Sequence, residues 1–382
     1  MSTDMMDPLR QEVAKAAHTV VIKVGTRVLT RADGTLNDER IAALAEQLNA
    51  VNESGRRVVL VSSGAVGAGM SHLGLVQRPT DLAKLQAVAA VGQTKLIEAY
   101  DRTFREHGRH AAQVLLTADD LDDRARYLNV RNTLTSLLEL DVIPIINEND
   151  TVAVDELMIT FGDNDRLAAL VTNLLRVPLL VILSDVDGLY SGDPVDRESQ
   201  LIDTVTSFDE VLDSYVQGAG SSLGTGGMAS KLRAARIVTA AGENVIIAGG
   251  RRDRILERIL SGETEGTLFL AEGRSVSSKK RWIGFSAKAR GRIFLDAGAR
   301  RAICERGTSL LAVGVLSAEG PFRKGDVVAL CDRDGHLFAR GLSNYSAQEI
   351  ERIKGLRSDK IAQVLGRRPY DEVIHRDNLA VL

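Results

Sequence analysis

Two lysines that are far apart in the chain stand where a cation could bind an anionic ligand. Lys23 lies near the end of an apolar, β-branched run that is typical of a buried parallel strand, and Gly25 follows it closely. A lysine is rarely buried without a partner, so we expect its head group at the carboxyl edge of the sheet, where open α/β folds bind ligands. The alternative is a lysine that merely reaches solvent where its strand ends.

Lys231 follows a glycine-rich stretch, Gly224–Ser230. Small residues let backbone N–H groups approach phosphate oxygens, and the helix expected from Met228 to Ala240 points its N-terminus at them. A cation is unfavourable in the first turn of a helix, so a nearby anion would account for it. The alternative is a flexible loop with a surface lysine. The Walker A pattern is absent, because Ser230 rather than glycine precedes the lysine.

Small, polar or acidic residues also follow three other apolar segments. These are Ser62-Ser63 after residues 58–61, Asn147–Asp150 after residues 142–146, and Ser184-Asp185 after residues 179–183. Turns favour such residues, which explains each group singly. Turns do not require a lysine or paired carboxylates, however, so the four strand ends taken together indicate a site at one edge of the sheet.

The stretch Phe161–Asp165 places two carboxylates and an amide in one turn that opens another expected helix. Asp163 alone could be a plain helix N-cap. The two carboxylates together could also bind a substrate ammonium group, orient a lysine or hold magnesium.

Strands and helices alternate from Val20 to about Leu270, with a long helix expected over Asp81–Phe104 and a hairpin over residues 151–160. This alternation predicts an α/β fold whose open, mostly parallel sheet is sandwiched by helices. Beyond it, Ser, Gly and Lys become frequent, and short strands follow, one of them expected over Leu311–Leu316. We therefore expect a disordered N-terminus over residues 1–15, a catalytic domain over 16–271, a linker over 272–284 and a small β-barrel-like domain over 285–382.

The charge is unevenly spread along the 382 residues. The chain carries a net −3, of which the part from Arg274 onward contributes +9 and the first 273 residues −12. Such asymmetry favours two units with different surfaces. Two cysteines are too few for a disulfide framework, the start lacks the apolar core of a signal peptide, and no apolar run reaches the ~20 residues of a membrane helix. We expect a cytoplasmic protein.

With these segments in order, the sequence resembles the amino acid kinase family. The matching stretches are Val21–Thr26, Val61–Gly64, Ile146–Asp150, Phe161–Leu167, Ser184–Tyr190 and Gly224–Lys231. Residues from about Phe285 to His375 resemble a PUA domain, a small β fold seen in RNA-modifying enzymes. The resemblance implies transfer of phosphate from ATP to the side-chain carboxylate of L-glutamate, giving L-glutamyl 5-phosphate and ADP, the first step of proline synthesis. The resemblance also implies Mg²⁺, feedback inhibition by proline, a homodimer or homotetramer, and functional coupling to the reductase that consumes glutamyl phosphate.

The resemblance also assigns site residues. It implies that Lys23 and Lys231 flank the transferring phosphoryl group and that Asp165 orients them. The implied glutamate-binding residues are Ser63, Asn147, Asp150, Asp163 and Asn164. The implied nucleotide-binding residues are Lys23, Gly25, Ser184, Asp185, Thr225, Gly226, Gly227, Met228, Ala229, Ser230 and Lys231. Metal ligands are left unassigned.

The implied chemistry agrees with the residue types. A carboxylate acceptor has a reference pKa of about 4.3 and is already ionised at neutral pH, so no general base is needed. None of the matched segments contains a histidine. Positioning and charge stabilisation then remain as the tasks of the site.

Two alternatives stay open at this stage. Within the fold, the acceptor could be acetylglutamate or a nucleoside monophosphate, although an acetylated substrate would not need Asp150 and Asp163. In another class, the basic C-terminal part could bind RNA, with Lys279–Arg281 and Arg367-Arg368 as clusters. That part lacks the aromatic surface on which single-strand binders stack bases, so we do not expect RNA binding. The segment Met70–Thr80 could be a lid over the site or simple surface.

Overall fold

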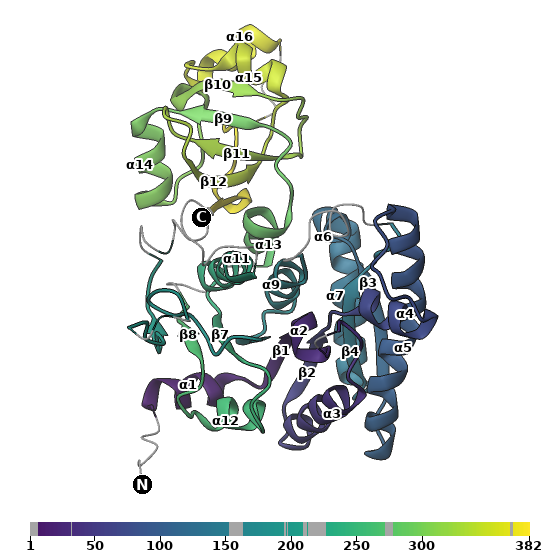
Figure 1. The fold of residues 1–382 in the computed structure, drawn as a ribbon. Coiled ribbons are helices and arrows are strands. Elements are labelled where there is room, and N and C mark those ends of the chain that lie inside the picture. Colours follow the sequence, from purple (N-terminus) through teal and green to yellow (C-terminus); the bar gives the residue numbers. More distant parts are fainter. Residues whose placement is uncertain are drawn as a thin grey trace. The chain divides into compact units, whose positions relative to one another are not determined.

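The computed structural model describes residues 7–31, 33–152, 163–194, 196, 198–208, 212, 227–271, 278–366 and 370–382. The chain divides into two compact units (Figure 1). The first comprises residues 1–121 and 125–275, and the second comprises residues 122–124 and 276–382.

The first unit is built on an eight-stranded sheet with the order β3-β4-β2-β1-β5-β7-β8-β6. Its strands are β1 (Thr19–Val24), β2 (Arg57–Val61), β3 (Ala111–Leu116), β4 (Ile143–Glu148), β5 (Leu179–Ser184), β6 (Thr204–Val205), β7 (Asn244–Gly249) and β8 (Thr267–Phe269). All neighbouring pairs run parallel except β7 and β8. This confirms the predicted mostly parallel sheet.

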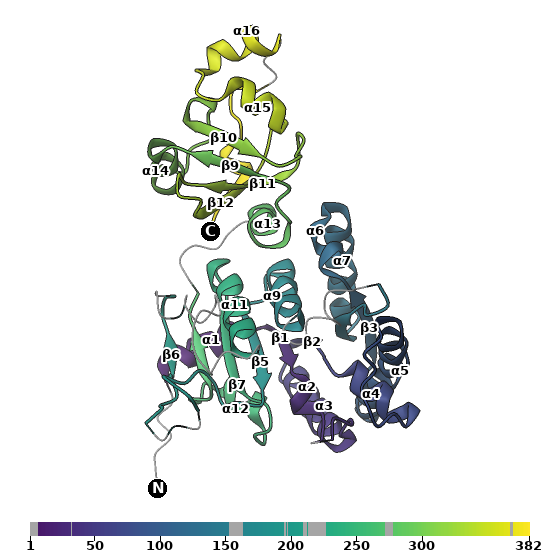
Figure 2. The same ribbon diagram turned by 45° about the horizontal axis from the view of Figure 1, so that its top comes forward.

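Helices cover both faces of this sheet (Figure 2). They are α1 (Pro8–Ala16), α2 (Thr26–Leu29), α3 (Asp38–Glu53), α4 (Ala65–Leu73), α5 (Leu82–Glu106), α6 (Ala118–Asp122), α7 (Arg124–Glu139), α9 (Asp163–Leu175), α11 (Gly227–Ala240) and α12 (Ile255–Ser261). Helices α9 and α11 pack together on one face, whereas α1, α3 and α12 lie on the other. Strand β1 is therefore buried along its whole length, which explains its nearly continuous apolar sequence.

The predicted disorder of residues 1–15 is wrong for the part that the structure describes. Residues 8–16 form helix α1, capped by the side chain of Asp7. The buried guanidinium of Arg10 donates hydrogen bonds to the carbonyls of Asp203, Glu265 and Gly266. These bonds tie the helix to the strand edge, whereas the prediction rested only on the usual fraying of chain ends.

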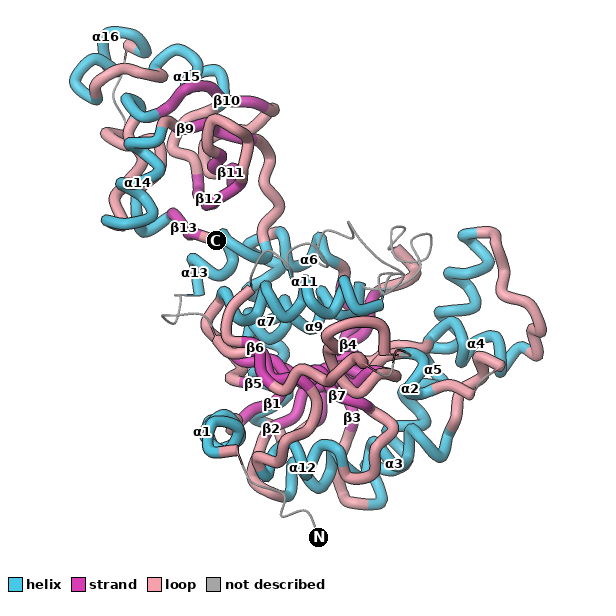
Figure 3. The backbone as a smooth tube through the Cα atoms, turned by 60° about the vertical axis from the view of Figure 1, so that its left-hand side comes forward, coloured by secondary structure: helices cyan, strands magenta, loops and turns pink. Residues whose placement is uncertain are grey.

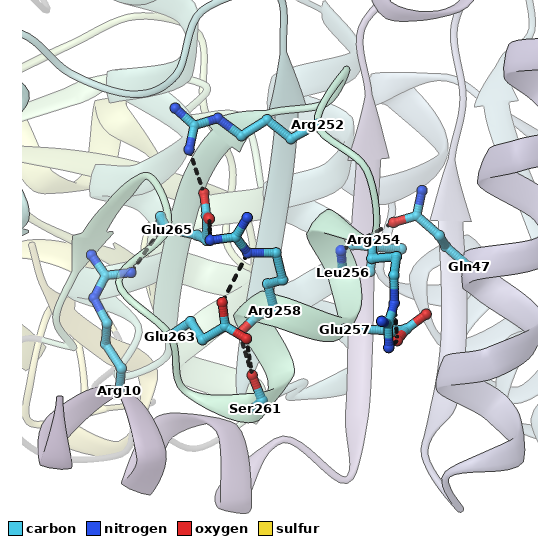
Figure 4. A network of polar contacts seen from close by, with 10 residues as sticks. All are labelled: Arg10, Gln47, Arg252, Arg254, Leu256, Glu257, Arg258, Ser261, Glu263 and Glu265. Atoms are coloured by element: carbon cyan, nitrogen blue, oxygen red, sulfur yellow. Dashed lines mark hydrogen bonds and ion pairs between the residues drawn. The ribbon is translucent and has the colours of Figure 1, made fainter. Parts of the chain in front are cut away.

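Ion pairs between charged side chains stabilise the region around α12 and the start of β8 (Figure 4). The buried carboxylate of Glu265 forms ion pairs with Arg252 at 3.0 Å and with Arg258 at 2.5 Å, and Arg258 also pairs with Glu263. Buried carboxylates need such partners, because removal from water is costly for a charge. The network joins α12 to the segment that leads into β8.

The second unit contains a five-stranded mixed sheet with the order β10-β9-β11-β12-β13. Its strands are β9 (Arg292–Leu295), β10 (Val315–Glu319), β11 (Val327–Cys331), β12 (Leu337–Leu342) and β13 (Leu379–Val381), and its longer helices are α14 (Ala297–Arg306) and α15 (Ala347–Ile353). The strand predicted over Leu311–Leu316 is wrong in its first part, because Ala312–Gly314 is a 3₁₀ turn. Part of the predicted linker is helical, with α13 at Ser278–Arg281 followed by a π-helical turn at Trp282–Ser286.

The long helix predicted over Asp81–Phe104 is present as α5, with Asp81 as its cap. Most of the hairpin predicted over residues 151–160 lies outside the described residues. Within the described chain, every helix is too short or too polar to cross a membrane. Figure 3 shows how helices and strands alternate along the chain in the first unit.

Candidate active site

The candidate site lies where neighbouring parallel strands end. Strand β1 pairs with β2 on one side and with β5 on the other, and Lys23 is in register with Val61 and Ile182. Strand β4 flanks β2. After β1 the chain first forms β2, β3 and β4 on one side of β1, and only later forms β5 on its other side. This change of direction opens a crevice at the carboxyl ends of the strands.

The two lysines converge on a single carboxylate, that of Asp165. Lys23 Nζ lies 2.7 Å from Asp165 Oδ1, and Lys231 Nζ lies 3.6 Å from Asp165 Oδ2. All three residues are buried, with exposed fractions of 6%, 8% and 2% for Lys23, Lys231 and Asp165. Strand β1 and helices α9 and α11, which are distant in sequence, thus supply one cluster of charge.

The electrostatics of the cluster follow from this burial. Burial by itself would raise the pKa of Asp165, but attraction to the two ammonium groups outweighs it and leaves the pKa below its ordinary value. Burial is also the main reason that the pKa of Lys231 is lowered, with repulsion from Lys23 acting in the same direction and attraction to Asp165 opposing it. The cluster holds two cations against one anion, and it is suited to a further negative charge.

The start of α11 contributes more than its lysine. Ser230 Oγ donates a hydrogen bond of 2.6 Å to Asp165 Oδ2, and Lys231 Nζ donates one of 2.8 Å to the Gly227 carbonyl. Helix α11 begins at Gly227, so Lys231 lies just after its first turn, and the anion beside it is Asp165. Thr225 and Gly226 lie outside the described residues.

A second group of predicted residues meets beside the lysines. The Asn164 side-chain amide donates to Ser63 Oγ and to Asn147 Oδ1, in both cases at 3.2 Å. Ser63 follows β2, Asn147 is in β4 and Asn164 stands in the first turn of α9. All three are buried. The side chain of Asp163, which was predicted to lie close by, is outside the described residues.

Asp150 is connected to this group by a residue that the sequence analysis did not single out. Gln93, which is buried in α5, donates from Nε2 to Asp150 Oδ2 at 3.1 Å. Burial raises the pKa of Asp150, while this hydrogen bond and the charge of Arg78 act in the opposite direction. The signal that could have indicated Gln93 is its place among the apolar residues on the buried face of α5.

The remaining predicted residues lie around the ends of β1 and β5. Ser184 Oγ donates to Asp185 Oδ1 at 3.2 Å, and Asp185 Oδ2 pairs with Arg27 at 3.0 Å. Burial alone would raise the pKa of Asp185, but the hydrogen bond from Arg27 contributes to a net lowering. A Cβ added at Gly25 would lie 3.7 Å from Lys23 Nζ, so glycine keeps the space beside that ammonium group open.

Most of these residues, though not Gln93, line one cavity of about 600 Å³. Its lining includes the predicted residues Lys23, Gly25, Ser63, Asn147, Asp150, Asn164, Asp165, Ser184, Asp185, Gly227, Ser230 and Lys231. Met228 and Ala229 are not among its described lining residues. The segment predicted to be either lid or surface contributes Met70, Leu75, Val76 and Arg78 to the wall.

Comparison with known proteins identifies the family. The model of the amino acid kinase family matches residues 18–249, which include all the lining residues named above. That match covers more than half of the chain. The chain belongs to the amino acid kinase family.

Relatives of this amino acid kinase extend over nearly its whole length. A protein named glutamate 5-kinase from Rhodopirellula baltica is 49% identical over 98% of this chain and 96% of the relative. Proteins of the same name from Caldanaerobacter subterraneus and Pseudomonas entomophila are each 48% identical, over 95% and 98% of this chain. A PUA domain model matches residues 291–365, which confirms the second resemblance. Among solved structures, carbamate kinase from Giardia lamblia bound to AMP-PNP is 18% identical, with a TM-score of 0.48 over 66% of this chain and 98% of that chain.

The geometry of this amino acid kinase suits phosphoryl transfer. Two buried ammonium groups, held by one carboxylate at the wall of a cavity, can stabilise charge on a transferring phosphoryl group without reorganising. The described lining residues include no histidine.

Proposed function

We propose that this chain transfers the γ-phosphoryl group of ATP to the side-chain carboxylate of L-glutamate, giving L-glutamyl 5-phosphate and ADP, the first step of proline biosynthesis. The observation that carries the proposal is the convergence of Lys23 and Lys231 on Asp165 at the cavity. The names of the relatives, which are about half identical over almost the full length, indicate glutamate as the acceptor.

The reaction needs positioning and charge stabilisation more than proton transfer. The glutamate carboxylate, ionised above a pKa of about 4.3, attacks the γ-phosphorus. A carboxylate oxygen–phosphorus bond forms, and the bond to the β–γ bridging oxygen breaks, leaving the electron pair on ADP. In our proposal Lys23 and Lys231 stabilise the charge on the phosphoryl oxygens, and Asp165 holds both ammonium groups in place.

The second group of residues would hold glutamate. Asp150, with Asp163 close by in the chain, offers carboxylates for the α-ammonium group, which an N-acetylated acceptor lacks. Ser63, Asn147 and Asn164 offer hydroxyl and amide groups for the rest of the substrate. Hydrogen bonds among these residues keep them in place, so their orientation does not have to be reached during binding.

The nucleotide would lie between the ends of β1 and β5 and the N-terminus of α11. Gly25, Ser184, Asp185 and the segment Thr225–Lys231 are its proposed partners, of which Gly25, Ser184, Asp185, Gly227, Ser230 and Lys231 line the cavity. Backbone N–H groups at the start of a helix of this length attract phosphate oxygens.

The acidic residues at the cavity fit a magnesium ion that enters with the nucleotide. Mg²⁺ keeps several waters and is bound through one or two carboxylates together with substrate phosphates. Asp185 lines the cavity, its side chain is 33% exposed, and it would be such a ligand. Bound there, Mg²⁺ would neutralise charge on the phosphates. A group of three possible metal ligands among the described residues, Asp332, Asp334 and His336, belongs to the other unit.

The test is ADP release from ATP and Mg²⁺ with a panel of acceptors. We expect turnover with L-glutamate, and trapping of its acyl phosphate by hydroxylamine as the hydroxamate, but none with N-acetylglutamate or a nucleoside monophosphate. Turnover with another acceptor and none with glutamate would overturn the proposal. We further propose inhibition by proline, to be measured in the same assay with proline added.

Three further features belong to the proposal. They are a homodimeric or homotetrameric assembly, functional coupling to the reductase that consumes glutamyl phosphate, and a cytoplasmic location. Cys304 and Cys331 are both free thiols, as a reducing compartment requires.

A further inference from the structure

The residues proposed to hold glutamate fall into two groups that one side chain bridges. Asn147, Asn164 and Ser63 form one hydrogen-bonded group at the ends of β4, β2 and the start of α9. Asp150 stands apart in the turn after β4. Gln93 donates from Nε2 to Asp150 Oδ2 at 3.1 Å and accepts at Oε1 from Asn147 Nδ2 at 3.2 Å.

The hydrogen bonds run in a single direction through this bridge. Asn164 donates to Asn147, Asn147 donates to Gln93, and Gln93 donates to the carboxylate of Asp150. The order also fixes the orientation of the Gln93 amide, because a flipped amide would turn its oxygen toward the carboxylate. Hydrogen bonds in such a chain polarise one another, and a charged acceptor at the end strengthens them.

Because Gln93 is buried, loss of its hydrogen bonds would cost free energy. Gln93 is 6% exposed and lies on a face of α5 that is otherwise mostly apolar, next to Leu96, Ala89 and Gly92. Its Nε2 also lies 3.4 Å from the carbonyl oxygen of Glu148. A buried amide without partners costs free energy, and so does a buried carboxylate or amide left behind by its loss.

The backbone of α5 is brought close to the site by small residues. A Cβ at Gly92 would lie 1.7 Å from the Ala65 carbonyl oxygen, and one at Gly69 would lie 1.9 Å from the Val88 carbonyl oxygen. Helices α4 and α5 therefore approach each other at backbone distance. This contact leaves the residue after Gly92 within reach of the end of β4.

We propose that Gln93 is a positioning residue that joins the Asp150 carboxylate and the Asn147 amide into one glutamate-binding surface, an inference that rests on the proposed function. Gln93 is outside the described lining of the cavity, so it acts through these two neighbours and does not itself touch substrate. Its loss should weaken binding of glutamate while leaving nucleotide binding and the lysine cluster intact.

The test compares steady-state kinetics of the full-length wild type with the Gln93→Leu variant. We expect the KM for glutamate to rise about 10- to 100-fold, the scale of a buried polar partner lost, while the KM for ATP changes less than about twofold. The control is Gln113→Leu, an exposed glutamine on β3, with wild-type values expected. Equal rises in both KM values, or an unchanged KM for glutamate, would overturn the proposal.

A double-mutant cycle separates positioning from general damage. Because Gln93 acts partly through Asp150, adding Gln93→Leu to Asp150→Asn should raise the KM for glutamate much less than it does in the wild type. Independent, multiplicative effects would overturn the proposal. Gln93→Glu, which keeps the size and the acceptor for Asn147 but loses the donor to Asp150, provides the same test should the leucine variant not fold: a wild-type KM for glutamate would overturn the proposal.

The same assays separate this inference from the function on which it rests. A wild-type enzyme without turnover on glutamate overturns both. A wild-type enzyme that is active on glutamate, together with a Gln93→Leu variant that keeps its KM for glutamate, overturns only the role of Gln93.

Discussion

At the scale of the residue, Asp165 allows two buried lysines to stand together. Two buried ammonium groups repel each other, and a carboxylate that forms ion pairs with both offsets that repulsion. Ser230 supplies a further hydrogen bond to the same carboxylate. In the proposed reaction, this arrangement would keep both cations oriented before the phosphoryl group arrives, which is the condition for electrostatic catalysis.

Loss of either lysine should therefore slow the chemical step. For Lys23→Ala and Lys231→Ala we expect kcat to fall about 10²- to 10³-fold, the scale of one lost donor at a charged transition state. Substitution of either lysine by arginine should also lower kcat, because the planar guanidinium group does not replace the compact charge of an ammonium group. Lys84→Ala, on the exposed surface of α5, is the control. A wild-type kcat in either lysine variant would contradict the proposed roles, as measured by ADP release at saturating substrates.

Asp150 should show its raised pKa in the pH dependence of glutamate use. Its carboxylate must be ionised to bind an ammonium group, and burial shifts protonation to a higher pH than for an ordinary aspartate. As pH falls through that raised pKa, kcat/KM for glutamate should decline earlier than titration of the substrate alone would cause. In Asp150→Asn, kcat/KM should be low and this extra acid limb should disappear. An identical acid limb in the variant would assign it to another group.

At the scale of the element, the crossing of α4 and α5 places Ser63 and Gln93 at one site. Helix α4 begins two residues after Ser63, and α5 carries Gln93 in its middle. The glycines at the crossing allow the two backbones to approach each other, and a side chain there has no space.

Gly92→Ala should disturb both stability and substrate binding. Relief of the contact with the Ala65 carbonyl requires the helices to separate, at a cost of about 1–3 kcal/mol in the free energy of unfolding. Urea unfolding measures this cost, and the KM for glutamate should rise in parallel. Ala90→Ser adds one atom at an exposed position of the same helix and serves as the control. Wild-type stability for Gly92→Ala would mean that the crossing can open without cost.

Helix α1 makes a separate prediction at this scale. Arg10→Met keeps much of the buried side-chain length but leaves the carbonyls of Asp203, Glu265 and Gly266 without their donor. We expect a loss of about 1–3 kcal/mol in the free energy of unfolding. Lys15→Met, an exposed change on the same helix, should have little effect. Equal stability of the two variants would show that α1 is not held by its arginine.

At the scale of the whole molecule, the two units have separate hydrophobic cores. One core includes alternate residues of β1, β2 and β5 together with α3 and α12, and the other is built from β9 to β13 with α14 and α15. All described lining residues of the cavity lie between Lys23 and Lys231, inside the first unit. The absence of RNA binding by the second unit stays a prediction.

A variant that ends at Ser275 should therefore keep the kinase activity. We expect its kcat with glutamate to lie within about threefold of the full-length value, since the residues proposed to carry the chemistry all lie in the first unit. Circular dichroism confirms that the shortened chain is folded before ADP release is measured. A folded but inactive variant would show that the second unit contributes to catalysis.

The sequence alone predicted the main alternation of strands and helices in the first unit, because β-branched runs, caps and glycines act locally, but it missed helix α1. It also predicted that four strand ends lie at one edge of the sheet, those with Lys23, Ser63, Asn147 and Ser184, since the carboxyl ends of neighbouring parallel strands share an edge. Only the tertiary structure decided which side chains touch. The bonds from Gln93 to Asp150 and from Arg10 to Glu265 span 57 and 255 residues of chain, and no local pattern encodes a partner at that separation.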